Sequence, residues 1–387
     1  MQAYLVGATS FMFLRIARYS KIPRVDQCDA CMVQVPEERP HAQWWRELVE
    51  EVDNYLKVDV NNPIELAIPS ASDRVRTRCI DCSVVSRSLP KGAFLRLELE
   101  TGTSIQIQSP EYSFVWLAHM LDLAVKDGQV SRAAARAIVV QYGCELCGTY
   151  APDANPTYIP GTNPDADSTH YFLEPATSAA KLCQWCQDAK GVPGVVFARS
   201  CAKRVVDLSG SPMETRHAVI LSFPCALGGV ALGEPLMNQE PTVGKSKKSV
   251  FHQWPFRPDL QWPAYDLYVE HLGGKHGMSE QYLEDSMREQ DYASFGALMF
   301  TTTLQDFETA NDYDNFLRRL AAGLSTRLTE DADRAAKRIR MAIDDRELRS
   351  TRWNVFDALA DSRDWWATGR ELAHMGREER RARRAAR

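Results

Sequence analysis

The sequence predicts an α+β protein. An irregular, zinc-stabilised N-terminal region of short strands and helices is followed by an all-helical C-terminal region. Three observations carry this expectation. All ten cysteines precede residue 226, and eight of them form four CxxC pairs. Alternating and helical apolar patterns both occur in that first part, whereas only helical spacing is found after about residue 278.

The chain has 387 residues, which is long for one domain, and its 44% hydrophobic content is enough for a core. Shifts in composition divide it into a zinc-binding α+β region over residues 1–226, a Gly/Pro/aromatic-rich arm or linker over 227–277, and a helical region over 278–387. The formal net charge of −5 argues against a bulk surface for polyanions.

The N-terminal elements follow from apolar spacing. Residues 3–14 are mostly apolar and predict a strand or buried segment, and no basic stretch precedes them as in a secretory signal. Apolar positions three and four apart predict a helix over 41–58. Alternation on both sides of Gly102 predicts a β-hairpin over 93–109.

Two helices and two strands are predicted next. The first helix covers residues 111–128, and the second begins at the cap Ser131 and stops at Gly143. The short apolar runs at 194–200 and 216–223 predict strands.

Proline and aromatic residues mark residues 227–277. Proline interrupts any regular element there, so we expect an extended arm laid across another surface, with a loop packed on its own domain as the alternative. Five aromatic residues are the expected anchors against a partner or a second copy: Trp254, Phe256, Trp262, Tyr265 and Tyr268.

The C-terminal region carries helical spacing throughout. Helices are expected over residues 279–290, 312–324 and 329–348, the last with Thr329 as its cap. A final helix is expected to begin near residue 361 and to run into the tail.

The four CxxC pairs are the most specific chemical signal. Two thiolates three residues apart can bind one zinc ion from a single turn, and two such turns complete a tetrahedral site. The sequence therefore predicts two structural zinc ions, held by Cys28, Cys31, Cys79, Cys82, Cys144, Cys147, Cys183 and Cys186. Iron–sulfur clusters, redox pairs and disulfides are the alternatives.

The pairing of these cysteines has two solutions. The sequential one joins the first pair to the second and the third to the fourth, and shorter loops favour it. The cross-braced one joins the first pair to the third and the second to the fourth. The unpaired Cys201 and Cys225 are expected to be buried and inert.

Familiar enzyme motifs are missing from the sequence. It has no phosphate-binding loop, dinucleotide-binding fingerprint, GxSxG or HExxH. Closed four-thiolate zinc sites leave no open coordination position, so these patterns predict a protein that is not an enzyme.

The C-terminal tail is basic. From Gly376 onward six arginines face two glutamates. Phosphate contacts of RNA or DNA are the expected role of five arginines: Arg380, Arg381, Arg383, Arg384 and Arg387. A solvated helix end, or arginines paired with acids of a neighbour, is the alternative.

These features predict a non-enzymatic zinc-binding structural protein, coat- or capsid-like or a subunit of a nucleoprotein assembly, whose partners are copies of itself or other subunits, with no membrane partner. The alternatives are a zinc-ribbon nucleic-acid-binding or regulatory protein and an enzyme without familiar motifs. Free thiols suit a reducing intracellular compartment, either the cytoplasm or the interior of a virion.

Overall fold

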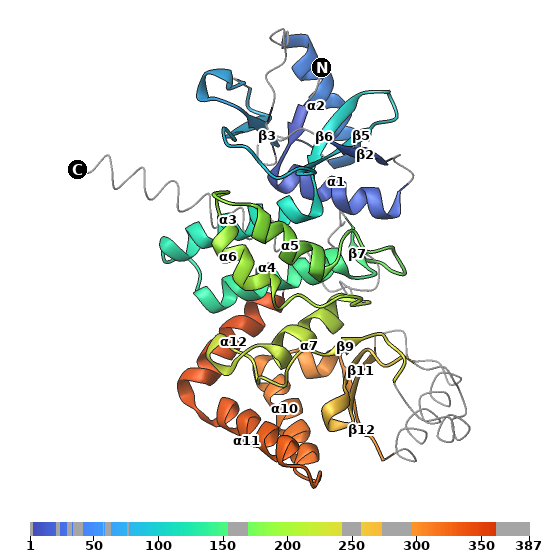
Figure 1. Cartoon of the computed structure of the whole chain (residues 1–387), viewed down its shortest axis with the longest axis vertical. Coiled ribbons are helices and arrows are strands. Elements are labelled where there is room, and N and C mark those ends of the chain that lie inside the picture. The colour runs from blue at the N-terminus through green and yellow to red at the C-terminus, as the bar shows by residue number, and fades with distance from the viewer. Residues whose placement is uncertain are drawn as a thin grey trace, which may run out of the picture.

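The structure is a computed structural model, and it describes most of the chain. The described residues are 3–20, 24–28 (backbone only), 33, 42–56, 58, 63–75, 77–153, 169–241, 257–272 and 296–360. They form three tiers along the long axis (Figure 1): an N-terminal sheet, a layer of helices, and a second sheet packed against the C-terminal helices.

The first tier contains a six-stranded sheet with strand order β2-β5-β6-β1-β3-β4. Its strands are β1 (Ala3–Leu5), β2 (Arg24–Cys28), β3 (Ile64–Ile68), β4 (Ile80–Val84), β5 (Phe94–Glu98) and β6 (Ser104–Gln108). Strands β5 and β6 form the predicted antiparallel hairpin, while β1 pairs with β6 in parallel. Strands β2 and β4 are therefore the two edges.

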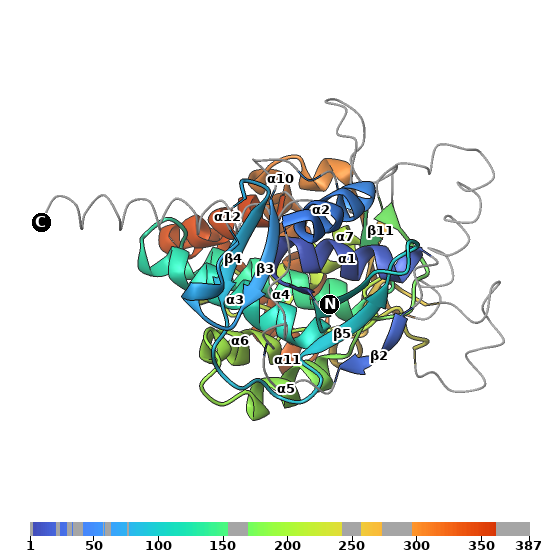
Figure 2. The same cartoon turned by 90° about the horizontal axis from the view of Figure 1, so that it is seen from above.

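Successive side chains of a strand point to opposite faces of the sheet, and in this sheet each face packs into a hydrophobic core. Tyr4 and Phe94 belong to the core shared with the middle tier, whereas Leu5 and Leu95 belong to a second core. Helices α1 (Gly7–Tyr19) and α2 (Ala42–Leu56) complete the second core, seen from above in Figure 2, and the short helix η1 (Ala71–Asp73) follows β3.

Gly7 allows the abrupt change from β1 to α1. Its φ of 61° lies in the left-handed region, and a Cβ there would overlap the carboxylate of Glu65. The backbone N–H of Gly7 donates to Gln108 Oε1 at 2.9 Å, and that of Ala8 donates to Glu65 Oε2 at 3.3 Å. Side chains from β3 and β6 thus satisfy the start of α1.

The middle tier is helical. It contains α3 (Pro110–Lys126), α4 (Arg132–Cys147), α5 (Ala179–Asp188) and α6 (Val195–Ala202), with the small β7–β8 pair (Ala151–Pro152 and Thr169–His170) beside them. Ser109 and Ser131 cap α3 and α4 through their hydroxyl groups.

The third tier is built on a four-stranded sheet with order β12-β11-β10-β9. Its strands are β9 (Leu236–Met237), β10 (Leu260–Trp262), β11 (Leu267–Leu272) and β12 (Leu298–Thr303). Strand β10 is antiparallel to both β9 and β11, and β12 is parallel to β11.

Helices surround this sheet. They are α7 (Pro212–Ser222), α10 (Ala310–Leu324), α11 (Glu330–Asp344) and α12 (Arg346–Ala360), with short η2 (Cys225–Leu227), η3 (Pro263–Tyr265) and η4 (Leu304–Phe307) turns. Over the ranges that the structure describes, no helix has the length and apolar character needed to cross a bilayer.

The mixed α and β content agrees with the predicted class, and the helices at 41–58 and 111–128 are confirmed. The strands expected at 194–200 and 216–223 are wrong, because these runs form α6 and α7. Most residues of these two helices are buried, so the sequence does not show the alternation of apolar and polar residues that would separate a helix from a strand.

Three other expectations need correction. Helix α4 does not stop at Gly143 but continues to Cys147. The C-terminal region is not all-helical, because β12 lies within it. The segment 329–348 is two helices, since the chain leaves helical geometry at Asp345. The helices expected at 279–290 and beyond residue 361 lie outside the described residues.

The described parts of the 227–277 segment belong to the third tier. Strands β9, β10 and β11 lie in it, and Trp262 and Tyr268 are buried within the chain itself. The indole Nε1–H of Trp262 donates to the Gly233 carbonyl at 2.9 Å. These two aromatics therefore pack within their own chain, as in the loop alternative, while Trp254 and Phe256 lie outside the described residues.

Candidate acidic site on the four-stranded sheet

The antiparallel strands β9, β10 and β11 bring distant polar residues into one row. Leu260 pairs with Met237 on one side and with Val269 on the other. One step outward, the same register places Asp259 between Asn238 and Glu270. The backbone N–H of Asn238 donates to the Asp259 carbonyl at 3.1 Å, which agrees with this placement.

Asp259 and Glu270 are carboxylates on neighbouring strands. The backbone N–H of His271 donates to Asp259 Oδ2 at 2.7 Å, which holds that carboxylate against β11. Glu270 is only 8% exposed, whereas Asp259 is half-buried. The register of the strands places these two acids directly opposite each other.

A third carboxylate comes from helix α7. Ser211 caps this helix by accepting from the Glu214 N–H at 3.2 Å, and Pro212 occupies its first turn. The position of Glu214 in that first turn directs its side chain back toward the sheet edge. There Glu214 Oε2 accepts from the Gly210 N–H at 2.7 Å and from Asn238 Nδ2 at 2.6 Å.

Glu214 is buried without a cationic partner among the described residues, and it is 7% exposed. Burial, followed by the charge of Asp259, raises the pKa of Glu214 well above its ordinary range, even though Gly210, Asn238 and Ser211 donate to it.

This electrostatic pattern suits a divalent cation. A bound cation would neutralise Glu214 and Asp259 together, and Mg²⁺ in proteins is commonly held by one or two carboxylates with waters completing the shell. Within the described ranges, no three metal-ligating side chains gather around one point. Mg²⁺ does not require such a group, because one or two carboxylates and water commonly hold it.

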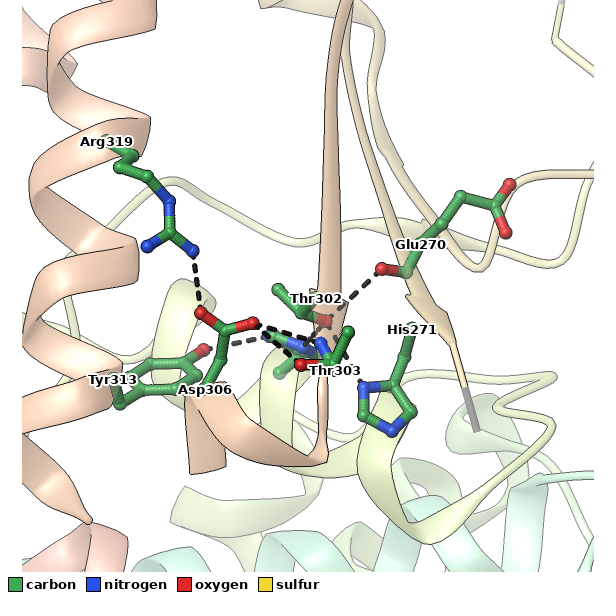
Figure 3. A network of polar contacts seen from close by, with 8 residues as sticks. Glu270, His271, Thr302, Thr303, Asp306, Tyr313 and Arg319 are labelled. Carbon is green, nitrogen blue, oxygen red and sulfur yellow. Dashed lines mark hydrogen bonds and ion pairs between the residues drawn. The ribbon is translucent and has the colours of Figure 1, made fainter. Parts of the chain in front are cut away.

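A polar network lies on the neighbouring part of the sheet (Figure 3). His217 of α7 contacts Thr302 Oγ1 through Nε2 at 2.8 Å and Tyr313 Oη through Nδ1 at 2.9 Å. The Thr302 hydroxyl also contacts the Glu270 carbonyl at 3.2 Å. Nearby, Arg319 pairs with Asp306 at 2.6 Å.

The predicted zinc ligands are spread over the first two tiers. Cys28 ends β2 and Cys82 lies in β4, on opposite edges of the six-stranded sheet. Five interstrand steps of about 4.8 Å separate these strands by roughly 24 Å. The sequential pairing of the first four cysteines would have to span this distance, and Cys31 lies outside the described residues, so this pairing stays a prediction.

The last two pairs lie closer together. Cys144 and Cys147 end α4, Cys183 and Cys186 lie on α5, and these two helices pack together. Burial raises the pKa of Cys144 and of Cys186 to about 12, and it also raises the pKa of Cys147 and of Cys183.

The two unpaired cysteines are not alike. Cys201 is fully buried, and burial raises its thiol pKa to about 12, whereas Cys225 is half-buried. The five tail arginines, Arg380, Arg381, Arg383, Arg384 and Arg387, lie outside the described residues.

The sequence analysis did not single out Glu214, Asp259 or Glu270. One local pattern was available, since residues 211–214 read Ser-Pro-Met-Glu, the spacing of a helix N-cap followed by an acid. The three acids are otherwise far apart in the chain, and only the pairing of the strands brings them together.

Comparison with protein-family models, with curated proteins and with solved structures found no match for this chain. The chemistry of the site therefore has to be argued from its own residues.

Proposed function

We propose that this chain is a divalent-cation-dependent hydrolase that cleaves phosphodiester bonds of nucleic acid. The observation that carries the proposal is the approach of the buried Glu214 to Asp259, two acids from α7 and from the residue before β10. Burial and the nearby acid both oppose the ionisation of Glu214, and groups with perturbed pKa values cluster at functional sites.

Each residue has a separate role in this proposal. Asp259 and Glu214 would hold the cation together. Asn238 and Gly210 hold one oxygen of Glu214 and so orient it. A bound cation would polarise the phosphoryl oxygen and lower the pKa of a bound water. Water then adds to phosphorus, the P–O ester bond breaks, and the leaving oxygen takes a proton.

Four lysines occur in the sequence between β9 and β12. Lys245, Lys247 and Lys248 lie between β9 and β10, and Lys275 follows β11 by three residues. These lysines lie outside the described residues, and we propose that they contact phosphates of the substrate. Asp259 is half-exposed, which suits a site at the surface of a large substrate. The arginine-rich tail is proposed to add contacts of the same kind.

A cleavage assay tests the proposal. Labelled single- and double-stranded DNA and RNA are incubated with purified protein in Mg²⁺ or in EDTA. We expect cleavage in Mg²⁺ that Asp259→Asn lowers by at least about a hundredfold, equivalent to ~2.7 kcal/mol of transition-state stabilisation.

A matched substitution controls for stability. Asp266 lies in the turn between β10 and β11, at the other end of these two strands from Asp259. It is exposed and has a φ of 47°. Asparagine tolerates that backbone conformation, so Asp266→Asn should leave cleavage unchanged. Equal cleavage by wild type and Asp259→Asn, or cleavage that persists in EDTA, would refute the assignment.

Zinc is proposed as a separate, structural cofactor. The packing of α4 against α5 brings Cys144, Cys147, Cys183 and Cys186 onto neighbouring helices, although no three of these described side chains gather around one point. Metal analysis should find zinc in the purified protein, and Cys186→Ser should remove one ion. Iron, or no metal, would contradict this proposal.

The non-enzymatic assembly subunit expected from the sequence is the alternative function. It predicts large oligomers in gel filtration that form without added Mg²⁺, together with no cleavage of any nucleic acid. A stable monomer that cleaves would exclude it.

A further inference from the structure

Phe172 is an exposed aromatic residue in a backbone conformation that favours glycine. Its side chain is 98% exposed, and its φ of 59° lies in the left-handed region. A bulky residue rarely adopts such a φ, because its Cβ lies too close to the following carbonyl oxygen, and residues held in this way cluster at active sites and ligand clamps. Burial does not explain a phenylalanine at this position, so we looked for a ligand that its ring would contact.

Leu208 shows the same combination on a neighbouring segment. Its φ is 66°, and its side chain is 36% exposed. Thr149 lies between the two segments, because its backbone N–H donates to the Ser209 carbonyl at 2.7 Å and its carbonyl accepts from the Leu173 N–H at 2.7 Å. Two hydrogen-bonded steps of about 4.8 Å place the segments that carry Phe172 and Leu208 roughly 10 Å apart.

This surface adjoins the acidic site. The Leu208 carbonyl accepts from Asn238 Nδ2 at 3.0 Å, and the same amide group donates to Glu214 Oε2 at 2.6 Å. Gly210, two residues after Leu208, donates its backbone N–H to that carboxylate oxygen at 2.7 Å. A long ligand that lies over the acidic site would therefore extend past Leu208 to the ring of Phe172.

The charges beside the ring favour contact with bases over contact with phosphates. Glu174 follows Phe172 by two residues, Asp207 precedes Leu208 directly, and both acids are exposed. Carboxylates repel phosphate, but they accept hydrogen bonds from the amino group of cytosine. Every base also has a π-face on which an aromatic side chain can stack, whatever the sequence.

A protein partner fits this surface less well. A stable protein interface covers about 800 Å² of each partner, and the core of such an interface is depleted of charged residues. Here the exposed acids Glu174 and Asp207 lie beside the two apolar side chains, so the surface offers separate apolar groups and no continuous apolar core. A planar base needs only one exposed ring.

We propose that Phe172 stacks on a base of single-stranded nucleic acid whose backbone crosses the acidic site. The inference rests on the proposed function and names the class of its substrate. The bases of a duplex stack on one another, so a protein ring reaches the face of a base only where the strand is unpaired. Leu208 provides a second apolar contact between the ring and the acids.

Phe172→Asn gives the sharpest test, because asparagine tolerates the left-handed conformation and removes the aromatic ring. The measurement is the binding of a short fluorescent DNA single strand to full-length protein in EDTA, followed by fluorescence anisotropy, so that no cation-dependent cleavage intervenes. We expect Phe172→Asn to weaken binding about 5–150-fold, as the loss of one base–aromatic stack does. Phe172→Trp keeps an aromatic face and should retain the affinity of wild type.

A fluorescent base in the strand reports the stacking itself. The fluorescence of 2-aminopurine is quenched when this base stacks, so wild type should quench it and Phe172→Asn should not. Stacking releases no counterions, whereas a phosphate contact does. The loss caused by Phe172→Asn should therefore be equal at low and at high salt, and a loss that disappears at high salt would overturn the inference.

Leu328→Asn provides the matched control. Leu328 is fully exposed and directly precedes Thr329, the N-cap of α11, so this variant also replaces an exposed apolar side chain by asparagine. The neighbouring Arg327 contacts the Asp266 carbonyl, at the other end of β10 and β11 from Asp259. Leu328→Asn should bind the single strand as wild type does. An equal loss in Leu328→Asn and Phe172→Asn would overturn the inference.

Three further outcomes separate this inference from the proposed function. If Phe172→Asn binds the single strand as tightly as wild type does, the inference is overturned, even where Mg²⁺-dependent cleavage supports the proposed function. If single-strand binding needs Phe172 but no nucleic acid is cleaved in Mg²⁺, the proposed function is refuted and Phe172 remains a base-stacking residue of a binding protein. If Phe172→Asn changes the oligomer size in gel filtration and leaves single-strand binding unchanged, the ring belongs to a protein interface and the inference is overturned.

Discussion

Glu145 and Glu214 are two buried glutamates with opposite surroundings. Glu145 is 1% exposed and lies against Arg15, whose Nε and Nη2 donate to its two oxygens at 2.9 and 2.8 Å. Glu214 is also buried, at 7% exposed, but its hydrogen-bond partners within the described residues are uncharged and a second acid, Asp259, lies close to it. The first carboxylate is fully paired, whereas the second has been placed where its charge is unfavourable.

The comparison distinguishes a buried carboxylate that stabilises the fold from one that is proposed to bind a ligand. The Arg15–Glu145 pair joins α1 to α4, so it fixes the first tier on the second. A buried pair of this kind holds geometry and offers nothing to a ligand. Glu214 instead lies close to Asp259, whose charge opposes its ionisation, and the proposed cation would bind there.

The largest expected effect is on stability. Glu145→Gln should lower the free energy of unfolding by about 3–5 kcal/mol, because it leaves the Arg15 guanidinium buried without its counter-charge. Urea denaturation followed by circular dichroism measures this value. The double variant Arg15→Met with Glu145→Leu should recover much of the loss, and a double variant as unstable as the single one would contradict the reason given.

Glu214→Gln should have the opposite effect on stability. Glutamine keeps an oxygen for Gly210 and Asn238 and removes the charge beside Asp259. We expect the metal-free variant to be more stable than wild type by roughly 0.5–2 kcal/mol at neutral pH, while cleavage is lost. Thermal unfolding in EDTA and the cleavage assay check both parts. A destabilised variant would mean that this carboxylate is structural, like Glu145.

The pH dependence of stability should distinguish the two glutamates further. The pKa of Glu214 is raised in the folded protein, so its contribution to stability is complete below the unfolded value near 4.3 and is lost as pH rises through the folded pKa. The advantage of Glu214→Gln over wild type should therefore grow with pH above about 4.3, by at most about 1.4 kcal/mol per unit. Urea unfolding in EDTA at several pH values measures it, and an advantage independent of pH would contradict the burial of a charged group.

The smallest expected effect on the free energy of unfolding is that of an exposed ion pair. Arg334 contacts Glu330 at 3.0 Å and Asp331 at 2.6 Å on the surface of α11. Water screens these contacts, so Arg334→Ala should cost only about 0.2–0.5 kcal/mol. Chemical denaturation can resolve this from Glu145→Gln, and a loss above about 1.5 kcal/mol would show that exposure is a poor guide to the worth of ion pairs in this chain.

The sequence predicts local structure well where a helix end or a turn has its own chemistry. Ser131 marks the start of α4, and the alternation around Gly102 marks the β5–β6 hairpin. It fails where burial removes the pattern, as in α7, whose residues 212–221 are all buried. In such a segment tertiary packing decides between helix and strand.

The candidate site was not predictable from spacing. The cysteine pairs can be recognised in the sequence because the two cysteines of each pair lie three residues apart. The order of the strands, which places β2 and β4 at opposite edges of the sheet, cannot be recognised in this way. The acids of the site lie on α7, next to β10 and on β11, and no local spacing relates them. Only the register of the strands places Asp259 beside Glu270.

Calorimetric titration of metal-stripped, full-length protein with Mg²⁺ shows whether the acidic site binds a cation. We expect wild type to bind Mg²⁺ at Glu214 and Asp259, Glu214→Gln and Asp259→Asn to abolish this binding, and Asp266→Asn to retain it. Wild type that binds no Mg²⁺, or an Asp259→Asn variant that binds it as tightly as wild type, would refute the proposed cation site.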